Sequence, residues 1–232
     1  MRAIHFIGGE KGGVGKSVMS RVLSQYFIDH ELPFVGFDTD KSHGSLLRFY
    51  ADFASPTIID DYESLDYLVE TLSNNPNSHV LVDLAAQTFD PLTNWINDSG
   101  LFEVLAEIKA PIFFWHVMDD SMDSLNLLSK LLDNYATNVS YIIVLNFGRG
   151  ANFKLFEASE QKQKALSLGA QVMKLGRLHE GAMRKIDVFG LSFWSAINNR
   201  EPADKSLGLL ERQRVKVWLN QAYKALSGLI PS

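Results

Sequence analysis

The sequence contains no cysteine among its 232 residues. This absence excludes a disulfide framework, thiolate metal sites and iron–sulfur clusters, because each of these needs cysteine sulfur. No apolar run approaches the length of a membrane-spanning helix, and the six histidines are scattered without metal-ligand spacing. The first residues lead directly into an apolar run, which leaves no room for a secretory signal. We therefore expect a soluble, cytoplasmic protein.

Acidic residues are scarce in the C-terminal quarter of the chain. The whole sequence has a net charge of −5, but from residue 170 onward ten basic residues stand against five acidic ones. This segment therefore carries about +5 and the rest of the chain about −10. A basic segment of this kind is a candidate surface for an acidic partner such as DNA, although it is more often a solvated face.

Apolar residues are arranged so that strands and helices alternate throughout the chain. The expected strands are 3–7, 34–37, 57–59, 80–84, 112–117, 140–145 and 171–175. The expected helices are 15–29, 64–72, 92–108, 121–135, 154–168 and 209–226. Strands that alternate with helices are joined by crossovers, which gives a mainly parallel, twisted sheet with helices on both faces. The length fits a single α/β domain over residues 1–232.

A glycine-rich stretch directly follows the first expected strand. It reads Gly8-Gly9-Glu10-Lys11-Gly12-Gly13-Val14-Gly15-Lys16-Ser17, and a helical apolar pattern begins behind it. This is the arrangement of a phosphate-binding loop, and it predicts the P-loop NTPase fold. The backbone N–H groups of such a loop and the positive end of the helix dipole bind an anion. Lys16 would reach the β- and γ-phosphates of a nucleotide, and the Ser17 hydroxyl would bind Mg²⁺.

The loop departs from the general pattern G-x-x-x-x-G-K-[ST] at one position. Glu10 stands where the first glycine would fall, and a second lysine, Lys11, follows it. In this form the loop resembles the deviant phosphate loop of the ParA/MinD family of ATPases. The resemblance implies ATP and Mg²⁺ as ligands. The nucleotide-binding residues that it implies are Gly12, Gly13, Val14, Gly15, Lys16, Ser17 and Val18.

Acidic residues follow two of the expected strands. Asp38 and Asp40 come after the second strand, and Asp83 ends an apolar run of Walker B type. Because ligands bind at the carboxyl ends of parallel strands, these carboxylates are candidates for the phosphate site. Asp83 would hold Mg²⁺ directly or through a water. The family's pattern implies that Asp38 supports the Mg²⁺ environment and that Asp40 positions the attacking water. Taken alone, these stretches also fit an acidic turn and a helix cap.

An asparagine follows the sixth expected strand, in the order Asn146-Phe147-Gly148-Arg149. In the family, an asparagine at this place binds the edge of adenine, which an amide can do with its one acceptor and two donors. Related GTPases carry a carboxylate here that reads guanine, and this sequence lacks it. The resemblance therefore favours adenine.

Lys11 is the residue that distinguishes this loop from the general pattern. In the family the matching lysine reaches across a dimer to the nucleotide of the partner subunit, as a counterpart of an arginine finger. We therefore expect an ATP-dependent homodimer, with Lys11, Lys16 and Asp40 as candidate catalytic residues. ATP hydrolysis is expected to be slow unless a partner protein stimulates it.

The C-terminal helix has one apolar face. Its members between Glu211 and Ile230 are Val215, Trp218, Leu219, Ala222, Tyr223, Leu226 and Ile230. Such a helix either packs on the sheet or, as in MinD-type members of the family, lies on a membrane. The wide apolar face and the few basic residues favour packing over membrane contact.

Two further stretches, 82–92 and 191–197, resemble ParA-like proteins of the TraL type, which conjugative-transfer and mobilisation regions of plasmids encode. Three uses remain open. DNA partition or transfer is favoured over membrane-based positioning of the division machinery. The third, a ligase similar to dethiobiotin synthetase, is disfavoured because such enzymes generally lack a lysine at the place of Lys11. The absence of cysteine excludes a nitrogenase-type iron protein.

Overall fold

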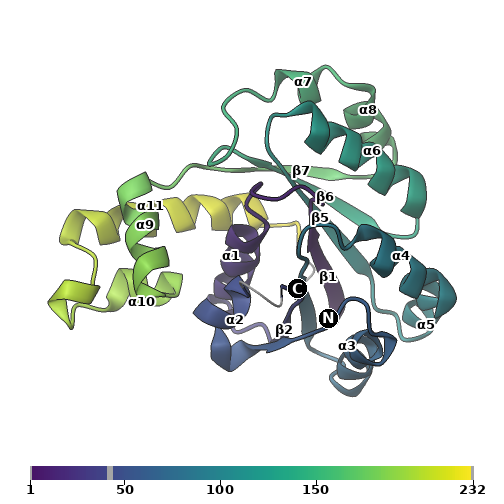
Figure 1. Cartoon of the computed structure of the whole chain (residues 1–232), viewed down its shortest axis with the longest axis horizontal. Coiled ribbons are helices and arrows are strands. Elements are labelled where there is room, and N and C mark those ends of the chain that lie inside the picture. The colour runs from purple at the N-terminus through teal and green to yellow at the C-terminus, as the bar shows by residue number, and fades with distance from the viewer. Residues whose placement is uncertain (1, 41–43, 231–232) are drawn as a thin grey trace.

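The computed structural model describes residues 2–40 and 44–230. Within these ranges the chain forms a sheet of seven parallel strands in the order β3-β2-β4-β1-β5-β6-β7 (Figure 1). The strands are β1 (Ala3–Gly8), β2 (Phe34–Asp38), β3 (Ala54–Pro56), β4 (His79–Asp83), β5 (Ile112–Met118), β6 (Ser140–Asn146) and β7 (Gln171–Leu175). The predicted α/β architecture with a parallel sheet is confirmed.

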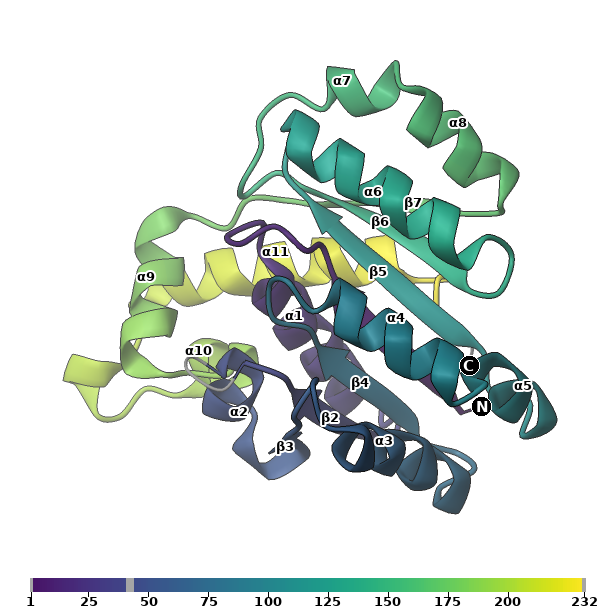
Figure 2. The same cartoon turned by 45° about the vertical axis from the view of Figure 1, so that its right-hand side comes forward.

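Helices cover both faces of this sheet (Figures 1 and 2). On one face lie α3 (Tyr62–Asn74), α4 (Phe89–Asp98), α5 (Leu101–Glu107), α6 (Met122–Tyr135), α7 (Lys154–Glu157) and α8 (Glu160–Ser167). On the other lie α1 (Lys16–Asp29), α2 (Ser45–Phe49), α9 (Glu180–Phe189), α10 (Phe193–Asn198) and α11 (Leu209–Leu226). Two short 3₁₀ turns, Ala51–Phe53 and Ala203–Lys205, complete the described elements.

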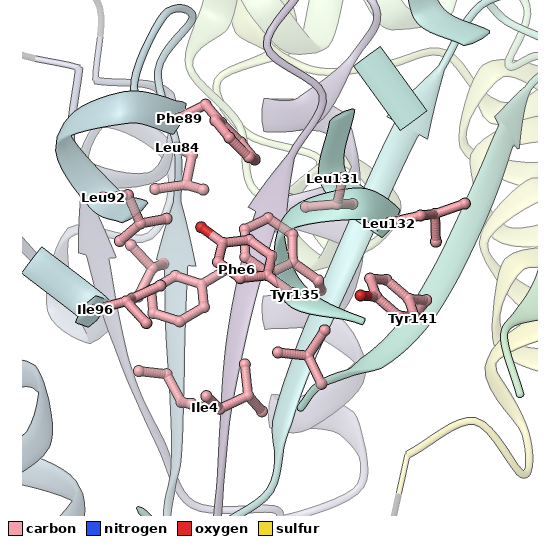
Figure 3. Packing of buried hydrophobic residues seen from close by; sticks show 14 of the residues in the cluster. Ile4, Phe6, Leu84, Phe89, Leu92, Ile96, Leu131, Leu132, Tyr135 and Tyr141 are labelled. Carbon is pink, nitrogen blue, oxygen red and sulfur yellow. The ribbon is translucent and has the colours of Figure 1, made fainter. Parts of the chain in front are cut away.

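Each face of the sheet has its own apolar core. Successive side chains of a strand point to opposite faces. Ile4 and Phe6 of β1 therefore pack under α4 and α6 (Figure 3). Ile7 packs on the opposite face, under α1. Strands covered on both faces need apolar residues at nearly every position, which is why continuous apolar runs form them. In the parallel register, Ile7 lies beside Asp83 and Asp38 beside Asp83, so the carboxyl ends of β1, β2 and β4 meet at one edge.

The structure differs from the expected elements in where some strands and helices begin, end or divide. The expected strand at 57–59 is wrong, because the edge strand β3 ends at Pro56. The helix expected over 92–108 is two helices, separated at Gly100, whose φ of 56° is left-handed. The helix expected over 154–168 is also divided, where Ser159 caps α8 through the N–H of Lys162. The helices α2, α9 and α10 had no expected counterpart.

A buried chain of three polar rings crosses the core beneath α1. Trp115 Nε1 donates to Nδ1 of His5 at 3.1 Å, and Nε2 of His5 lies 3.0 Å from Nδ1 of His79. Because the indole is only a donor, Nδ1 of His5 must accept, so a neutral His5 carries its proton on Nε2 and donates it to His79. Burial lowers the pKa of both histidines, that of His79 to about 4. Both rings are therefore neutral at pH 7.

The C-terminal helix α11 packs on the sheet beside β7. Its apolar residues Val215, Trp218 and Leu219 are buried, and Trp218 Nε1 donates to the carbonyl of Gly176 at 2.6 Å. The apolar face identified in the sequence is thus covered by the chain's own core. Within the described ranges, no helix is both long enough and apolar enough to cross a membrane.

The small helix α10 is fixed by a side chain of α1 and by Tyr50, the residue that follows α2. The N–H of Trp194 donates to Oε1 of Gln25 at 2.9 Å, and the N–H of Phe193 donates to the Tyr50 hydroxyl at 3.3 Å. Tyr50 also donates to Gln25 at 3.2 Å. Since the first N–H groups of a helix have no partner inside it, these bonds complete the start of α10 from a distant part of the chain.

Candidate functional site

The glycine loop connects β1 to α1 in a conformation that only glycine adopts easily. Gly13 and Gly15 have left-handed φ angles of 80° and 98°. A Cβ on Gly15 would lie 2.2 Å from Nδ2 of Asn146, and one on Gly9 would lie 2.3 Å from the carbonyl oxygen of Val117. The backbone thus approaches the neighbouring strands closely and directs the start of α1 at the carboxyl edge of the sheet.

A cavity of about 450 Å³ opens over this loop. It brings together nine of the twelve residues that the sequence assigned to the site. They are Gly12, Gly13, Gly15, Lys16, Ser17, Val18, Asp38, Asp40 and Asp83. The three others, Lys11, Val14 and Asn146, lie around the loop without lining the cavity within the described part of the chain. The phosphate loop and the acidic strand ends therefore share one hollow.

Lys16 lies at the start of α1, and its side chain is largely buried. Its Nζ donates to the carbonyl oxygen of Lys11 at 3.0 Å. Burial lowers the pKa of Lys16, while the negative charges of Asp83, Glu10 and Asp40 raise it and offset part of that effect. A largely buried ammonium group in the wall of this cavity is suited to bind an anion there.

Asp83 is the most strongly perturbed group of the cavity. Burial and the neighbouring Asp38 raise its pKa to about 7, although hydrogen bonds with Ser20 and Ser17 act in the opposite direction. Its Oδ1 is fully buried and finds no hydrogen-bond partner among the described residues. A buried carboxylate oxygen without a partner is costly, so a ligand at this place would stabilise it.

Asp83 and Ser17 fit a magnesium ion. Mg²⁺ binds oxygen ligands, takes one or two carboxylates from the protein and completes its shell with waters and phosphate oxygens. Asp83 offers a carboxylate oxygen that lacks a partner among the described residues, and the Ser17 hydroxyl lies near enough to the same carboxylate to lower its pKa. These two side chains are therefore the part of the site that would hold the ion.

The carboxylate of Asp38 is bonded to backbone N–H groups. Its Oδ2 accepts from Leu46 at 2.8 Å and from Leu47 at 3.2 Å, at the start of α2. Its Oδ1 accepts from the N–H of Asp40 at 3.0 Å. Asp38 thus caps α2 and shapes the turn that carries Asp40 into the cavity. The expected support of Mg²⁺ by Asp38, and of the attacking water by Asp40, stay predictions.

Asn146 holds the phosphate loop from the end of strand β6, which lies two strands from β1 in the sheet. Its Nδ2 donates to the carbonyl of Val14 at 2.7 Å, and its Oδ1 accepts from the N–H of Gly148 at 2.9 Å. One donor hydrogen of the amide is left over by these two bonds. Its expected contact with adenine stays a prediction. A second hollow of about 440 Å³ lies beside Asn146 and shares Val18 and Arg149 with the first cavity.

Lys11 forms an ion pair inside its own chain. Its Nζ lies 2.8 Å from Oδ2 of Asp119 and donates to the Ser121 hydroxyl, also at 2.8 Å. Burial raises the pKa of Asp119, but hydrogen bonds from Lys11, Ser121 and Ser124 outweigh this and hold it well below the ordinary value. The lysine is thus positioned beside the loop by residues that follow β5.

Sequence reasoning missed three arginines in the wall of the cavity: Arg21, Arg48 and Arg149. Arg21 is buried, donates to Asp187 at 2.8 Å and lies 3.7 Å over the ring of Phe49. It stands four residues after Ser17, one helical turn along the same face, which is a signal that could have identified it. The other two depend on tertiary packing.

No protein-family model matches the chain. Protein MobD of Acidithiobacillus ferrooxidans is 25% identical over 99% of this chain and 98% of its own length. Protein TraL of Escherichia coli is 24% identical, with 94% of each chain covered. The septum site-determining protein MinD of Pyrococcus horikoshii, solved with Mg-ADP, has a TM-score of 0.54 at 14% identity over 99% of this chain and 98% of its own.

The predicted resemblance to the ParA/MinD family, with TraL-type relatives, is confirmed. MinD of Aquifex aeolicus, in complex with MinC, has the same fold at a TM-score of 0.55 and 13% identity, covering 99% of this chain and 98% of its own. The sequence relatives thus match nearly the whole chain, as do these solved structures. The phosphate loop, the Asp83 strand and α11 therefore belong to one continuous fold that is similar to that of MinD.

Proposed function

We propose that the chain binds ATP together with Mg²⁺, hydrolyses it slowly and acts as a ParA/MinD-type molecular switch. The observation that carries the proposal is the buried Oδ1 of Asp83, which has no hydrogen-bond partner among the described residues. Asp83 lies near Ser17 and lines the cavity over the phosphate loop. The MinD structure from Pyrococcus horikoshii was solved with Mg-ADP, and a nucleotide-binding protein of Archaeoglobus fulgidus was solved with ADP.

The nucleotide would bind across the two adjoining hollows. The N–H groups of the loop and Lys16 would bind its phosphates, since they combine backbone donors with a positive charge. The base would lie in the second hollow, beside Asn146 and Trp218, because this hollow is next to Val18 at the start of α1. Mg²⁺, held by Ser17 and Asp83, would neutralise charge on the phosphate oxygens. Asp40 would position the water.

We further propose that ATP binding drives the formation of a homodimer. Lys11 would leave Asp119 and contact the phosphates of the second subunit. At about 4 Å and an effective dielectric constant near 20, such a contact is worth about 4 kcal/mol before desolvation. The ion pair that it replaces is partly exposed and worth at most about 1 kcal/mol. We infer that the exchange favours the dimer when ATP is present, because the phosphates carry several negative charges and Asp119 carries one.

The process that we favour is DNA transfer or partition. Support comes from the relatives named TraL and MobD and from the basic segment after residue 170. In this proposal the segment binds DNA in the ATP state, and a partner protein stimulates hydrolysis. Affinity for DNA should fall steeply as salt rises, because bound Lys and Arg release counterions. Cytoplasmic location is proposed with it and can be tested by cell fractionation.

Isothermal titration calorimetry with Mg-ATP tests the central claim. We expect binding by the parent chain, and a loss of at least about 30-fold in affinity for Lys16→Ala, because one charged hydrogen-bonding group is removed. Lys154→Ala, which changes an exposed lysine of α7, serves as the control and should bind like the parent. A parent chain that binds neither ATP nor ADP would reject the proposal.

The dimer and its process have their own tests. Analytical ultracentrifugation of Asp40→Ala with Mg-ATP should show a dimer that disappears when Lys11 is replaced by alanine. A MinD-like role on membranes is the alternative, and vesicle co-sedimentation in the presence of ATP would reveal it. The burial of the apolar residues of α11 argues against that alternative. A small-molecule ligase is less favoured still, because of Lys11.

A further inference from the structure

Glu10 lies within the phosphate loop, but its carboxylate accepts a hydrogen bond from the start of helix α4. Its Oε1 accepts a hydrogen bond of 2.6 Å from the N–H of Phe89, the first residue of α4. Among the described residues, Glu10 does not line the phosphate cavity. It lines a small hollow of about 20 Å³ together with Ala85 and Thr88. A negative charge next to a phosphate site is thus directed away from it.

The first turn of α4 depends on this bond. The N–H groups at a helix start need partners from outside the helix, and the positive end of the helix dipole favours a carboxylate there. Thr88 occupies the N-cap position, but in the described chain its side chain does not cap α4. Its hydroxyl donates instead to the carbonyl of Ala85 at 3.0 Å. Glu10 therefore caps α4 from 79 residues away in the sequence.

The segment between β4 and α4, residues 84–88, borders the phosphate cavity. Leu84, Ala85 and Ala86 line that cavity. Near its start, the N–H of Ala85 donates to the Thr39 hydroxyl at 2.7 Å. Gln87 has a left-handed φ of 62°, which a non-glycine residue keeps only where its surroundings hold it. The segment is thus fixed near its start by the residue after β2 and at its end by Glu10.

We propose that Glu10 is a positioning residue for hydrolysis, because it fixes the 84–88 segment against the phosphate loop at the wall of the cavity. The inference rests on the proposed ATPase function. Glu10 itself makes no bond to the nucleotide and takes no proton in the reaction. Positioning lowers the barrier of the chemical step without adding to ground-state binding, so its loss lowers kcat and leaves KM for ATP nearly unchanged.

Two substitutions of Glu10 separate the hydrogen bond from the charge. Glu10→Ala removes the acceptor, whereas Glu10→Gln keeps an acceptor oxygen in the same place. Asp90→Asn is the control, because Asp90 lies in the same first turn but is exposed and pairs with Lys130. We expect kcat to fall at least about 10-fold in Glu10→Ala, with KM within about twofold of the parent. Glu10→Gln should stay within about threefold, and Asp90→Asn at parent values.

Unchanged kcat in Glu10→Ala would overturn the inference, as would equal losses in Glu10→Ala and Glu10→Gln. Amide hydrogen exchange without nucleotide gives a second readout. In Glu10→Ala, residues 84–92 should exchange at least about 10-fold faster, while β1 and α1 keep parent rates. Unchanged exchange would also overturn it, even if the parent shows no hydrolysis. A parent that does not bind ATP would reject the proposed function, and the exchange data would still decide whether Glu10 fixes this segment.

Discussion

Lys11 and Asp119 of the same chain form an ion pair of 2.8 Å, and Ser121 completes the environment of the ammonium group. Lys11 is also the residue that we propose to act on the nucleotide of a second subunit. The two roles exclude each other, because one ammonium group cannot hold Asp119 and reach a neighbouring molecule at once. The strength of the Asp119 contact would therefore enter the proposed dimerisation equilibrium.

Replacing Asp119 by asparagine is expected to strengthen the ATP-dependent dimer. The substitution removes the negative charge that competes for Lys11 but keeps an acceptor for Ser121 and Ser124. A partly exposed pair is worth at most about 1 kcal/mol, so each of two contacts would gain up to about fivefold. Sedimentation of the Asp40→Ala background with Mg-ATP measures this. Asp133→Asn, which breaks the exposed pair with Lys164, is the control. A weaker dimer in Asp119→Asn would contradict the prediction.

Asp83 is expected to destabilise the nucleotide-free protein at high pH. Its pKa is raised to about 7 in the folded chain from the ordinary 3.8. Because the pKa of Asp83 is higher in the folded chain, its contribution to stability is complete below the ordinary pKa of 3.8. The contribution is lost as the pH rises from there through the folded pKa of about 7. Asp83→Asn should therefore unfold with a higher free energy than the parent at pH 8, by up to about 4 kcal/mol, and show little difference near pH 4.

Chemical denaturation at several pH values measures this difference, and Asp60→Asn, an exposed carboxylate, should show no such trend. Asp83→Asn should also lose Mg²⁺ binding, so the same substitution would raise the free energy of unfolding and remove the proposed metal site. A difference between Asp83→Asn and the parent that does not grow with pH would argue against a perturbed Asp83.

Acid should weaken the core through His5 and His79. Burial lowers both pKa values, and a lowered pKa of a base stabilises the fold above the unfolded pKa near 6.5. That contribution is lost as pH falls from about 6.5 towards 4, and protonation also removes an acceptor from the ring chain. His79→Gln should reduce the acid loss between pH 7 and 5 by about 1–2 kcal/mol. An unchanged slope of unfolding free energy against pH would refute it.

Gly15→Ala should destabilise the protein without any ligand present. The new Cβ would lie 2.2 Å from Nδ2 of Asn146, and the φ of 98° is unfavourable for alanine. Asn146 would have to give up its bond to Val14, so we expect a loss of about 2 kcal/mol or more. Gly12→Ala is the matched control, because a Cβ there meets no described atom within 4 Å. Denaturant unfolding compares the two, and equal stabilities would disprove the steric argument.

The sequence predicted those parts of the fold that local pattern determines. Strand 171–175 and helix 209–226 were predicted with the bounds that the structure gives them, because their apolar spacing is regular. The short helix α10 escaped prediction because its first N–H groups are bonded by Gln25 and Tyr50, which are far away in the sequence. Hydrogen bonds between residues that are distant in the sequence produce no periodic pattern of apolar residues from which a helix could be predicted.

The candidate site shows the same division. The sequence pattern alone predicted that the glycine loop, Lys16 and Ser17 share one cavity with Asp83, since each lies at the carboxyl end of a parallel strand. The bonds of Asn146 to Val14 and of Glu10 to Phe89 were not predictable, because they join residues 132 and 79 positions apart. These bonds use polar groups that the motif alone would assign to a ligand.

The attachment of α10 to Gln25 and Tyr50 has a consequence for engineering this protein. The basic C-terminal segment shares its interior with the helix that carries the phosphate loop, for Phe193 and Val215 belong to the same buried cluster as Val22. A shortened chain that stops after β7 would leave Arg21 and this apolar surface open to water. Any attempt to study the nucleotide pocket apart from the basic segment should therefore begin from surface charge reversals, not from deletion.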